Sequence, residues 1–272
     1  ADIDLSAYSS GSGWTPIGNK NKFSGTFDGN GHKITNLYIN TLGGYQGLFS
    51  NTENATIKNL GIDSGEIRCG DINSGGLIGF AASSTIINSY TNVDIVNVGV
   101  SDIEWLGANG GLIGRTFTSG TIDYCYTTGN VISTGKQCGG LIGLNDNADI
   151  SNCFATGDVK IDLGFAGGLI GQTTNGNITN CFATGNVYGK KELGGLIGYT
   201  GNGNISNCHS IGNVCSNGTQ CSGGFIGAGN GTVSNCYTTG NVYSSGSFVG
   251  GFIGASNGSE TSTITNCIAT GN

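Results

Sequence analysis

The segment Gly75-Gly76-Leu77-Ile78-Gly79 recurs along the chain and decides its fold class. Six further copies, the last two with Phe in place of Leu, begin at Gly110, Gly139, Gly167, Gly194, Gly223 and Gly250. The steps between successive copies are 35, 29, 28, 27, 29 and 27 residues. A period in this range is typical of repeat architectures, in which each unit packs only on its neighbours.

A second motif, Ile-x-Asn-Cys, keeps the same period, and a Gly follows each Cys by four residues. Short β-prone runs alternate here with Gly, Asn, Ser and Thr turns, and no run keeps helical spacing for long enough to form a helix. The sequence therefore predicts an all-β fold, a parallel β-solenoid of stacked β-arches with about 28 residues per coil and about eight or nine coils. We expect residues 1–50 to form a divergent N-terminal coil or cap, and residues 51–272 to form the repeats.

Stacked coils place equivalent side chains in columns along one axis. The predicted aliphatic column is Ile34, Ile57, Ile86, Ile122, Ile150, Ile178, Ile205, Val233 and Ile264. The predicted Asn column, in which Tyr124 replaces one Asn, is Asn36, Asn59, Asn88, Asn152, Asn180, Asn207, Asn235 and Asn266. Amide side chains stacked in this amyloid-like way can hydrogen-bond along the axis and satisfy turn backbone.

Most of the ten cysteines follow the same period. The predicted Cys column, free or bridged, is Cys125, Cys153, Cys181, Cys208, Cys236 and Cys267. Neighbouring coils lie about 4.8 Å apart, which a disulfide can span, but a free Cys also packs well as a small buried hydrophobe. Cys215 and Cys221 flank a short loop and predict a loop disulfide. Cys69 and Cys138 have no obvious partner, which makes them candidates for bonds between subunits.

An aromatic strip follows the Cys column by one position, and a Thr strip follows two positions later. The aromatic strip is Tyr90, Tyr126, Phe154, Phe182, His209, Tyr237 and, in the last coil, Ile268. The Thr strip is Thr128, Thr156, Thr184, Ile211, Thr239 and Thr270. If the strips point outward, they suit a carbohydrate or another sheet, and if they point inward, they are core. Turns reset the alternation of side chains, so the sequence leaves both orientations open.

Composition restricts the class of protein. The chain has 53 Gly but only one Pro and no three-residue Gly period, which excludes collagen. Its net charge of −7 is scattered, which argues against nucleic-acid binding, and no apolar run could span a membrane. Ten Cys without Cys-x-x-Cys pairs favour an oxidising, extracellular setting. A chain that begins at Ala1 and lacks Met is typical of a mature form after removal of a signal peptide.

Catalytic residues do not emerge from the pattern. Asp94 and Asp158 share one column but stand two coils apart, about 9.6 Å, at the outer limit for an inverting glycosidase pair. His32 and His209 fall far apart in the array, so no nucleophile triad and no metal cluster is formed. The sequence predicts no catalytic, cofactor or metal site, and a protein that is not an enzyme.

The two motifs together resemble those of the GLUG-repeat proteins, and Phe23–Ile34 is similar to the segment that often precedes such repeats. The resemblance implies a secreted or cell-surface β-solenoid of bacteria or methanogenic archaea, and it brings no catalytic residues. Members are usually described as adhesin-like and carry other domains, whereas this chain is almost entirely repeat. That difference favours a building block, such as a subunit of an archaeal sheath.

We therefore expect a structural subunit of an extracellular layer, sheath or filament that assembles with itself. The last repeat ends inside a coil, at Thr270-Gly271-Asn272, without an amphipathic cap, and an open strand edge is a template for another chain. The expected partner is a second copy, joined edge to edge and cross-linked by disulfides in one version of this hypothesis. The alternative is a surface adhesin or glycan-binding module that uses the aromatic strip.

Overall fold

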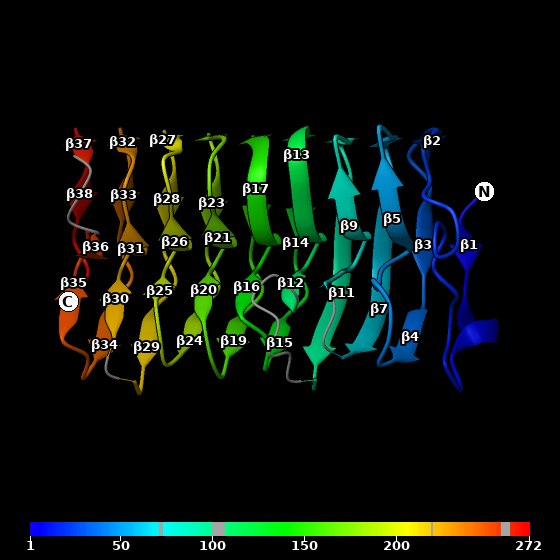
Figure 1. Cartoon of the computed structure of the whole chain (residues 1–272), viewed down its shortest axis with the longest axis horizontal. Coiled ribbons are helices and arrows are strands. Elements are labelled where there is room, and N and C mark those ends of the chain that lie inside the picture. The colour runs from blue at the N-terminus through cyan, green and yellow to red at the C-terminus, as the bar shows by residue number, and fades with distance from the viewer. Residues whose placement is uncertain (71–72, 100–106, 219, 257–261) are drawn as a thin grey trace.

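The protein is a parallel β-solenoid, as predicted. The computed structural model describes residues 1–70, 73–99, 107–218, 220–256 and 262–272. Within these ranges the strands pair in parallel, and one isolated bridge, between Gly13 and Ile39, is antiparallel. The one helix among the described residues is a short 3-10 helix, η1 (Ser6–Tyr8), near the N-terminus. The coils lie side by side along one axis, with the two ends of the chain at opposite ends of the stack (Figure 1).

Three sheets run along the stack. The seven-stranded sheet contains β8 (Ser74–Gly75), β12 (Ala108–Gly110), β16 (Gln137–Gly139), β20 (Phe165–Gly167), β25 (Leu193–Gly194), β30 (Cys221–Gly223) and β35 (Phe248–Gly250). The 15-stranded sheet contains β2 (Thr26–Asp28), β5 (Phe49–Glu53), β6 (Thr56–Lys58), β9 (Ile78–Ala82), β10 (Thr85–Ile87), β13 (Ile113–Asp123), β17 (Ile142–Ser151), β21 (Ile170–Thr173), β22 (Asn177–Thr179), β26 (Ile197–Thr200), β27 (Asn204–Ser206), β31 (Ile226–Gly229), β32 (Thr232–Ser234), β36 (Ile253–Ala255) and β37 (Thr263–Thr265). The 16-stranded sheet contains β1 (Ile3–Asp4), β3 (Lys33–Thr35), β4 (Leu37–Thr41), β7 (Gly61–Cys69), β11 (Tyr90–Asn97), β14 (Tyr126–Thr127), β15 (Val131–Ser133), β18 (Phe154–Ala155), β19 (Val159–Ile161), β23 (Phe182–Ala183), β24 (Val187–Gly189), β28 (His209–Ser210), β29 (Val214–Ser216), β33 (Tyr237–Thr238), β34 (Val242–Ser244) and β38 (Ile268–Ala269).

The aliphatic column is in register from coil to coil, which confirms the predicted stacking. Its nine members are Phe27, Ile57, Ile86, Ile122, Ile150, Ile178, Ile205, Val233 and Ile264. The first member differs from the prediction, because Ile34 pairs with Ile62 on the 16-stranded sheet and Phe27 takes the place beside Ile57. The Phe27 ring packs edge-on against Phe49 with centroids 5.4 Å apart, a contact that favours this register.

The Gly-Gly-Leu-Ile-Gly motif turns the chain from the seven-stranded sheet into the 15-stranded sheet. Its Leu and Ile side chains are buried in every coil from Leu77 to Ile226. A Cβ at Gly139 would lie 2.0 Å from the carbonyl oxygen of Ile142, and one at Gly140 would lie 2.1 Å from that of Gly168 in the next coil. Real Cβ atoms do not approach backbone this closely, so the glycines allow neighbouring coils to touch.

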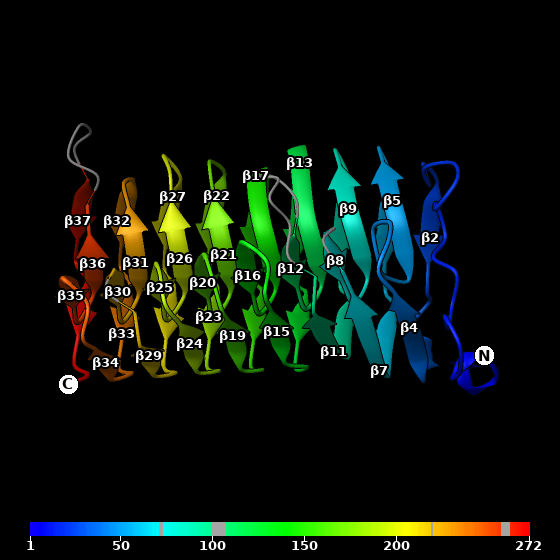
Figure 2. The ribbon, with the colours of Figure 1, turned by 60° about the horizontal axis from the view of Figure 1, so that its bottom comes forward.

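Residues 1–50 are less regular than the later coils. Tyr8 packs edge-on against Trp14 with ring centroids 5.3 Å apart, and Phe23 packs on Phe49 at 5.1 Å. This segment lies at the N-terminal end of the stack (Figure 2). That it acts as a separate cap remains a prediction.

Tyr124 is the one aromatic residue in a position otherwise held by Asn. Its φ is 50°, in the left-handed region, and its side chain is 61% exposed. A bulky side chain in this region of φ destabilises the fold by about 1–2 kcal/mol, whereas Asn is tolerated because its short side chain hydrogen-bonds to nearby groups. We expect Tyr124→Asn to raise the free energy of unfolding in urea by about 1 kcal/mol. The reciprocal change, Asn152→Tyr, should lower it by a similar amount, and a neutral Tyr124→Asn would contradict this account.

Candidate functional site

The Asn column forms the turn between the 15-stranded and 16-stranded sheets. Its Asn residues from Asn59 to Asn266 adopt left-handed φ values between 48° and 56°. Side chains bond along the axis, with Nδ2 of Asn88 donating to Oδ1 of Asn59 at 2.8 Å and Nδ2 of Asn266 donating to Oδ1 of Asn235 at 2.7 Å. Asn36 lies outside this column, because it follows β3 and its Nδ2 donates to Asp4. The column is a structural turn.

The Cys column lies next in the chain and faces the core. All six of its thiols are free, and all but Cys267 are buried. The Cys208 thiol donates to the carbonyl of Ser206 at 3.1 Å and accepts the N–H of Cys181 at 3.4 Å. Hydrogen bonding to the Cys181 thiol, together with burial, raises the pKa of Cys208 to about 12. Neutral thiols therefore serve here as small side chains that also satisfy backbone groups.

The other four cysteines lie outside the Cys column. Cys69 and Cys138 are both buried in the core, and burial raises the pKa of Cys69 to about 11. That they join subunits remains a prediction, which the burial of both side chains in this structure does not favour. Cys215, in β29, and Cys221, in β30, flank the loop as expected and are both free in this structure, so the loop disulfide remains a prediction.

Thiol labelling tests this distribution. We expect a maleimide at neutral pH to label three cysteines of the native protein, the partly exposed Cys215, Cys221 and Cys267. All ten cysteines should react in denaturant without a reductant. Mass spectrometry would give both counts. Fewer than ten labels in denaturant would mean that disulfides are present.

The aromatic strip lies on the outer face of the 16-stranded sheet, which settles its orientation. Successive rings from Tyr90 to Tyr237 stack with centroids 4.7 to 4.9 Å apart and interplanar angles of 2° to 7°. The rings are half-buried, and Ile268 continues the strip as an exposed side chain. Because each ring covers the faces of its neighbours, the strip presents ring edges to solvent.

The first ring is held by charged neighbours. The hydroxyl of Tyr90 donates to the Asp63 carboxylate at 2.9 Å, and Nζ of Lys33 lies 2.6 Å from the same carboxylate. Burial, followed by the Asp63 charge, raises the pKa of Tyr90 to about 12. Burial also lowers the pKa of His209, so this ring stacks as a neutral imidazole at neutral pH.

Asp94 and Asp158 belong to a ladder that caps backbone groups. Oδ1 of Asp94 accepts the N–H of Asn130 at 2.7 Å, and Oδ1 of Asn130 accepts the N–H of Asp158 at 3.0 Å. Asn186, Asn213 and Asn241 continue the pattern with bonds of 2.9 to 3.0 Å. These carboxylates are thus occupied in holding the turn, and their geometry supports no catalytic pair.

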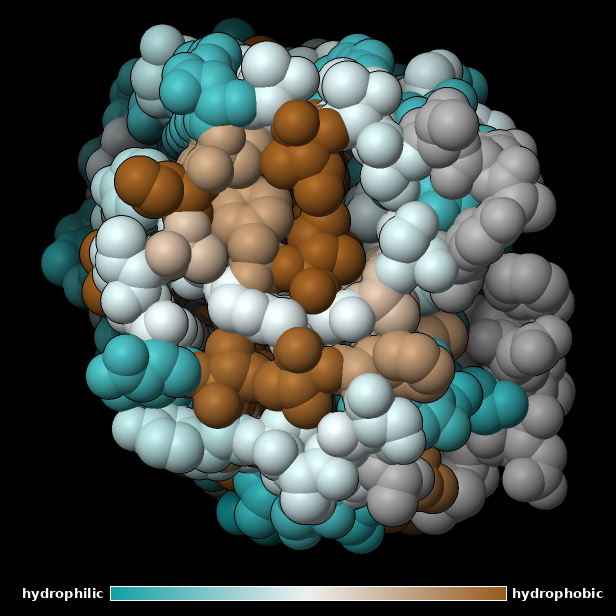
Figure 3. Space-filling view, turned by 90° about the vertical axis from the view of Figure 1, so that its left-hand side faces the viewer, coloured by the Kyte–Doolittle hydropathy of each residue, from teal (hydrophilic) through white to brown (hydrophobic). Residues whose placement is uncertain are grey.

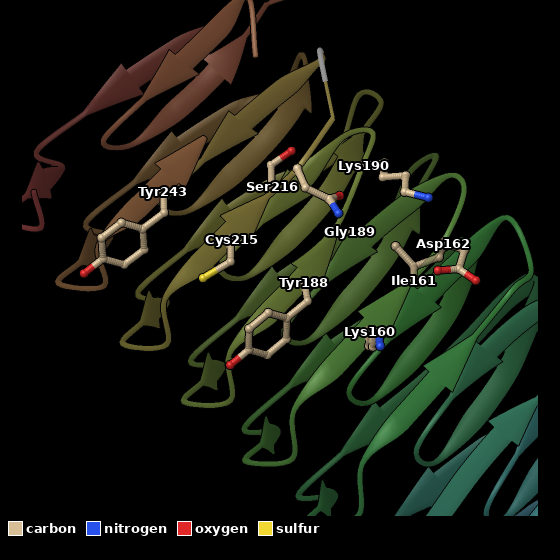
Figure 4. Close-up of a pocket in the computed structure, with 10 residues that line it drawn as sticks. Lys160, Ile161, Asp162, Tyr188, Gly189, Lys190, Cys215, Ser216 and Tyr243 are labelled. Atoms are coloured by element: carbon tan, nitrogen blue, oxygen red, sulfur yellow. The ribbon is translucent and has the colours of Figure 1, made fainter. Parts of the chain in front are cut away.

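A groove that sequence reasoning missed lies on the same outer face, in the C-terminal half (Figure 4). Its cavity volume is about 570 Å³. It is lined by Lys160, Ile161, Asp162, Tyr188, Gly189, Lys190, Cys215, Ser216, Asn217 and Tyr243. The available signal was the column itself, in which the small Cys215 stands between two tyrosines.

No group of three or more His, Cys, Asp or Glu side chains in the described ranges could hold a metal ion. None of the helical segments described is long and apolar enough to cross a membrane.

Part of the chain matches a known family of repeats. The model of the GLUG motif family matches residues 135–160, 166–188 and 191–214. The chain contains GLUG repeats. Each matched stretch lies within the stacked coils described above, so the GLUG repeat of this chain is a coil, or most of one, of a parallel β-solenoid.

Two relatives match parts of the chain. A protein of Evansella cellulosilytica, provisionally named a Gly-rich membrane protein, is 50% identical over 66 residues, or 22% of this chain and 8% of the relative. Halomucin of Haloquadratum walsbyi is 31% identical over 170 residues, or 52% of this chain and 2% of the relative. The chain thus matches only a small part of each of these much longer proteins.

Among solved structures, a Bacteroides ovatus protein provisionally described as an immunoglobulin A1 protease has a similar fold. It aligns with a TM-score of 0.60 over 81% of this chain and 68% of its own, at 22% identity. Similarity at this level of identity concerns the fold alone.

Proposed function

We propose that this chain is a non-enzymatic structural subunit of an extracellular layer, sheath or filament, and that copies join end to end through the edges of their coils. The observation that carries the proposal is the apolar surface that each coil offers to the next one, which a coil of a second copy can cover as well as a further coil of the same chain. Val233 is 2% exposed, whereas Ile264, its in-register partner in the last coil, is 48% exposed. Figure 3 shows apolar side chains gathered at the centre of this end with polar groups around them.

Unpaired backbone at the same end supports the proposal. Within the described ranges, β34 to β38 each pair with a strand of the preceding coil only. Such an edge offers free N–H and C=O groups to another parallel strand. A second copy in register would satisfy these groups and cover the apolar side chains, and repeated head-to-tail contacts of this kind build filaments. A place at the cell surface is supported by the GLUG repeats and by the relative named as a membrane protein.

Gly251 provides a test of end-to-end contact. A Cβ at Gly224 would lie 2.2 Å from the carbonyl oxygen of Gly251 in the next coil, whereas a Cβ at Gly251 meets only the Cβ of Ala269, at 3.5 Å. We expect Gly251→Ala to fold normally but to block a further coil from stacking, because its methyl group would occupy the position of that coil's carbonyl.

Electron microscopy and analytical ultracentrifugation of the 272-residue chain would provide the measurement. Wild type should form filaments or large oligomers, and Gly251→Ala should remain monomeric. Gly43→Ala is the matched control, because an added Cβ there meets nothing within 4 Å. A wild type that stays monomeric, or a Gly251→Ala variant that assembles as well as wild type, would contradict the proposal.

A second candidate function is glycan binding by a surface adhesin. The specific observation in its favour is the gathering of tyrosine side chains on the outer face, in the aromatic strip and in the groove. Tyrosine offers a large apolar face and a hydrogen-bonding hydroxyl, a combination suited to sugars.

A further inference from the structure

The outer face of the 16-stranded sheet presents four columns of side chains over the last six coils. In the first of these coils Tyr126, Thr128, Asn130 and Ile132 face outward and the residues between them are buried, as expected for an extended strand. We call this surface the lateral face. Its columns are the aromatic strip from Tyr126 to Ile268, the Thr strip, the Asx ladder Asn130, Asp158, Asn186, Asn213, Asn241 and Asn272, and the outer column Ile132, Lys160, Tyr188, Cys215 and Tyr243.

Large apolar side chains concentrate on the lateral face. Those exposed on it are Ile132, Tyr188, Ile211, Tyr237, Tyr243 and Ile268. Away from the last coil, the described part of the 15-stranded sheet exposes only Phe117 on its outer face, and the Arg115 guanidinium lies 5.4 Å from the centroid of that ring. Single exposed apolar residues are normal, whereas a contiguous group of them marks an interaction surface.

Charge is nearly absent from the lateral face. Its columns contain two charged side chains, Asp158 and Lys160, which have opposite signs. The sequence follows the same trend, because of its 10 basic and 17 acidic residues only Glu260 follows residue 192, and Glu260 lies outside the described residues. Burial lowers the pKa of His209, so this ring adds no charge at neutral pH. Exposed tyrosine with few charges is the composition found at the centre of protein interfaces.

The shape of the lateral face selects its partner. Strands β15, β19, β24, β29 and β34 follow one another in a row along the stack and keep one register (Figure 2). Beside them the rings stack closely, with the centroids of Phe154 and Phe182 4.8 Å apart. Apart from the groove at Cys215, the face is therefore an even array that repeats about every 4.8 Å. A second copy of this chain supplies an array with the same repeat, which can match the face in every coil.

The area of the lateral face supports the same partner. Two residues of a strand span about 6.6 Å and neighbouring strands lie about 4.8 Å apart, so four columns over six coils cover roughly 700 Å². Stable protein interfaces bury about 800 Å² on each partner. Two even sheets can pack face to face about 10 Å apart, with their strands within about 30° of each other. The lateral face is thus large enough for a specific contact, near the lower end of the stable range.

We propose that the lateral face packs on the lateral face of a second copy, as the two sheets of a sandwich related by a two-fold axis. Because the described part of the chain has one apolar and nearly uncharged face along the stack, the contact closes on a pair. The inference deepens the proposed function and rests on it for the filament, since copies that join end to end then form a double filament. Lateral contacts add along such a filament, so a contact that is weak between two subunits holds two filaments together.

Gly251→Ala allows the lateral contact to be measured apart from the end-to-end contact. Because the face is small and partly polar, we expect a dissociation constant of about 0.1 mM, so that this variant is a monomer in dilute solution and mostly a dimer near 1 mM. Adding Thr239→Lys places a charge on the lateral face of both copies and should weaken pairing at least about 100-fold. Sedimentation equilibrium over this range would measure both constants.

Thr232→Lys is the matched control. Thr232 lies in the same coil as Thr239 and is likewise exposed, but it belongs to β32 of the 15-stranded sheet. In the Gly251→Ala background it should change the dissociation constant by less than about twofold. Circular dichroism would verify that both lysine variants fold.

Electron microscopy of the two lysine substitutions in the otherwise wild-type chain tests the double filament. Filaments of wild type and of Thr232→Lys should be paired, and those of Thr239→Lys should be single. Single wild-type filaments, a Gly251→Ala variant that stays monomeric at 1 mM, or equal weakening by the two lysines would overturn the lateral contact and leave the face to another occupant, such as a glycan. Pairing of Gly251→Ala without any wild-type filaments would overturn the proposed function and leave the lateral contact standing.

Discussion

Gly140→Ala should lower the free energy of unfolding by about 3 kcal/mol or more. The added Cβ would lie 2.1 Å from the carbonyl oxygen of Gly168 and 2.8 Å from the Cβ of Ala155. The Gly168 segment cannot move away cheaply, because it is hydrogen-bonded to the coils on both sides. Opening the contact would therefore separate two coils along the motif, where the buried Leu and Ile side chains of the core begin.

Gly251→Ala is the matched control for this prediction, because it is the same motif position in the last coil. Its added Cβ meets only a side-chain carbon at 3.5 Å, an ordinary contact, so the free energy of unfolding should change by less than about 1 kcal/mol. Urea unfolding followed by circular dichroism would give both values. Equal losses in the two variants would show that the glycine is needed for its backbone conformation and not for the approach of the next coil.

The period of the sequence was sufficient to predict the register of most of the solenoid. Ile122, Ile150 and Ile178 pair directly with one another, because a parallel stack brings residues one period apart to the same place. The same logic placed Asp94 and Asp158 in one column with Asn130 between them. It could not say that these side chains bond to backbone N–H groups, since that depends on the shape of the turn.

The first coils show where the period fails. The run Ile34-Thr35-Asn36-Leu37 resembles the later Ile-x-Asn-Cys motif. It lies on the 16-stranded sheet, however, where Ile34 pairs with Ile62. By sequence, either Thr26–Asp28 or Ile34–Leu37 could pair with the strand that contains Ile57. Packing of the Phe27 ring on Phe49 favours Thr26–Asp28, which matches the repeat motif less well. Contact between aromatic side chains in the core is a tertiary effect, which local spacing does not contain.

Orientation was the other limit of sequence reasoning. The aromatic strip and the Cys column are adjacent in the chain and face opposite ways, but the sequence did not say which of them faces the core, because the Asn and Gly turns on either side reset the alternation. For the same reason Cys69 and Cys138 could not be identified as core residues. Their burial depends on strands β7 and β16, which turn their side chains toward the inside of the coil.

Cys208→Ala should lower the free energy of unfolding by about 2–3 kcal/mol. It removes the acceptor of the Cys181 N–H and leaves a small cavity in a buried position. Cys208→Ser should cost less than about 1 kcal/mol, because serine naturally occupies the equivalent position at Ser89. There its Oγ donates to the carbonyl of Ile87 at 3.0 Å and accepts the N–H of Leu60 at 3.3 Å.

The pair of substitutions also decides between a free and a bridged Cys column. If Cys208 were in a disulfide, Ser and Ala would both break the bond, and the two variants would lose a similar 2–4 kcal/mol, approximately the usual contribution of a disulfide. Dithiothreitol would then also lower the stability of wild type. Buried thiols with a raised pKa react slowly with oxidants, since the thiolate is the reactive form. We therefore expect the serine variant to stay within about 1 kcal/mol of wild type, with and without reductant.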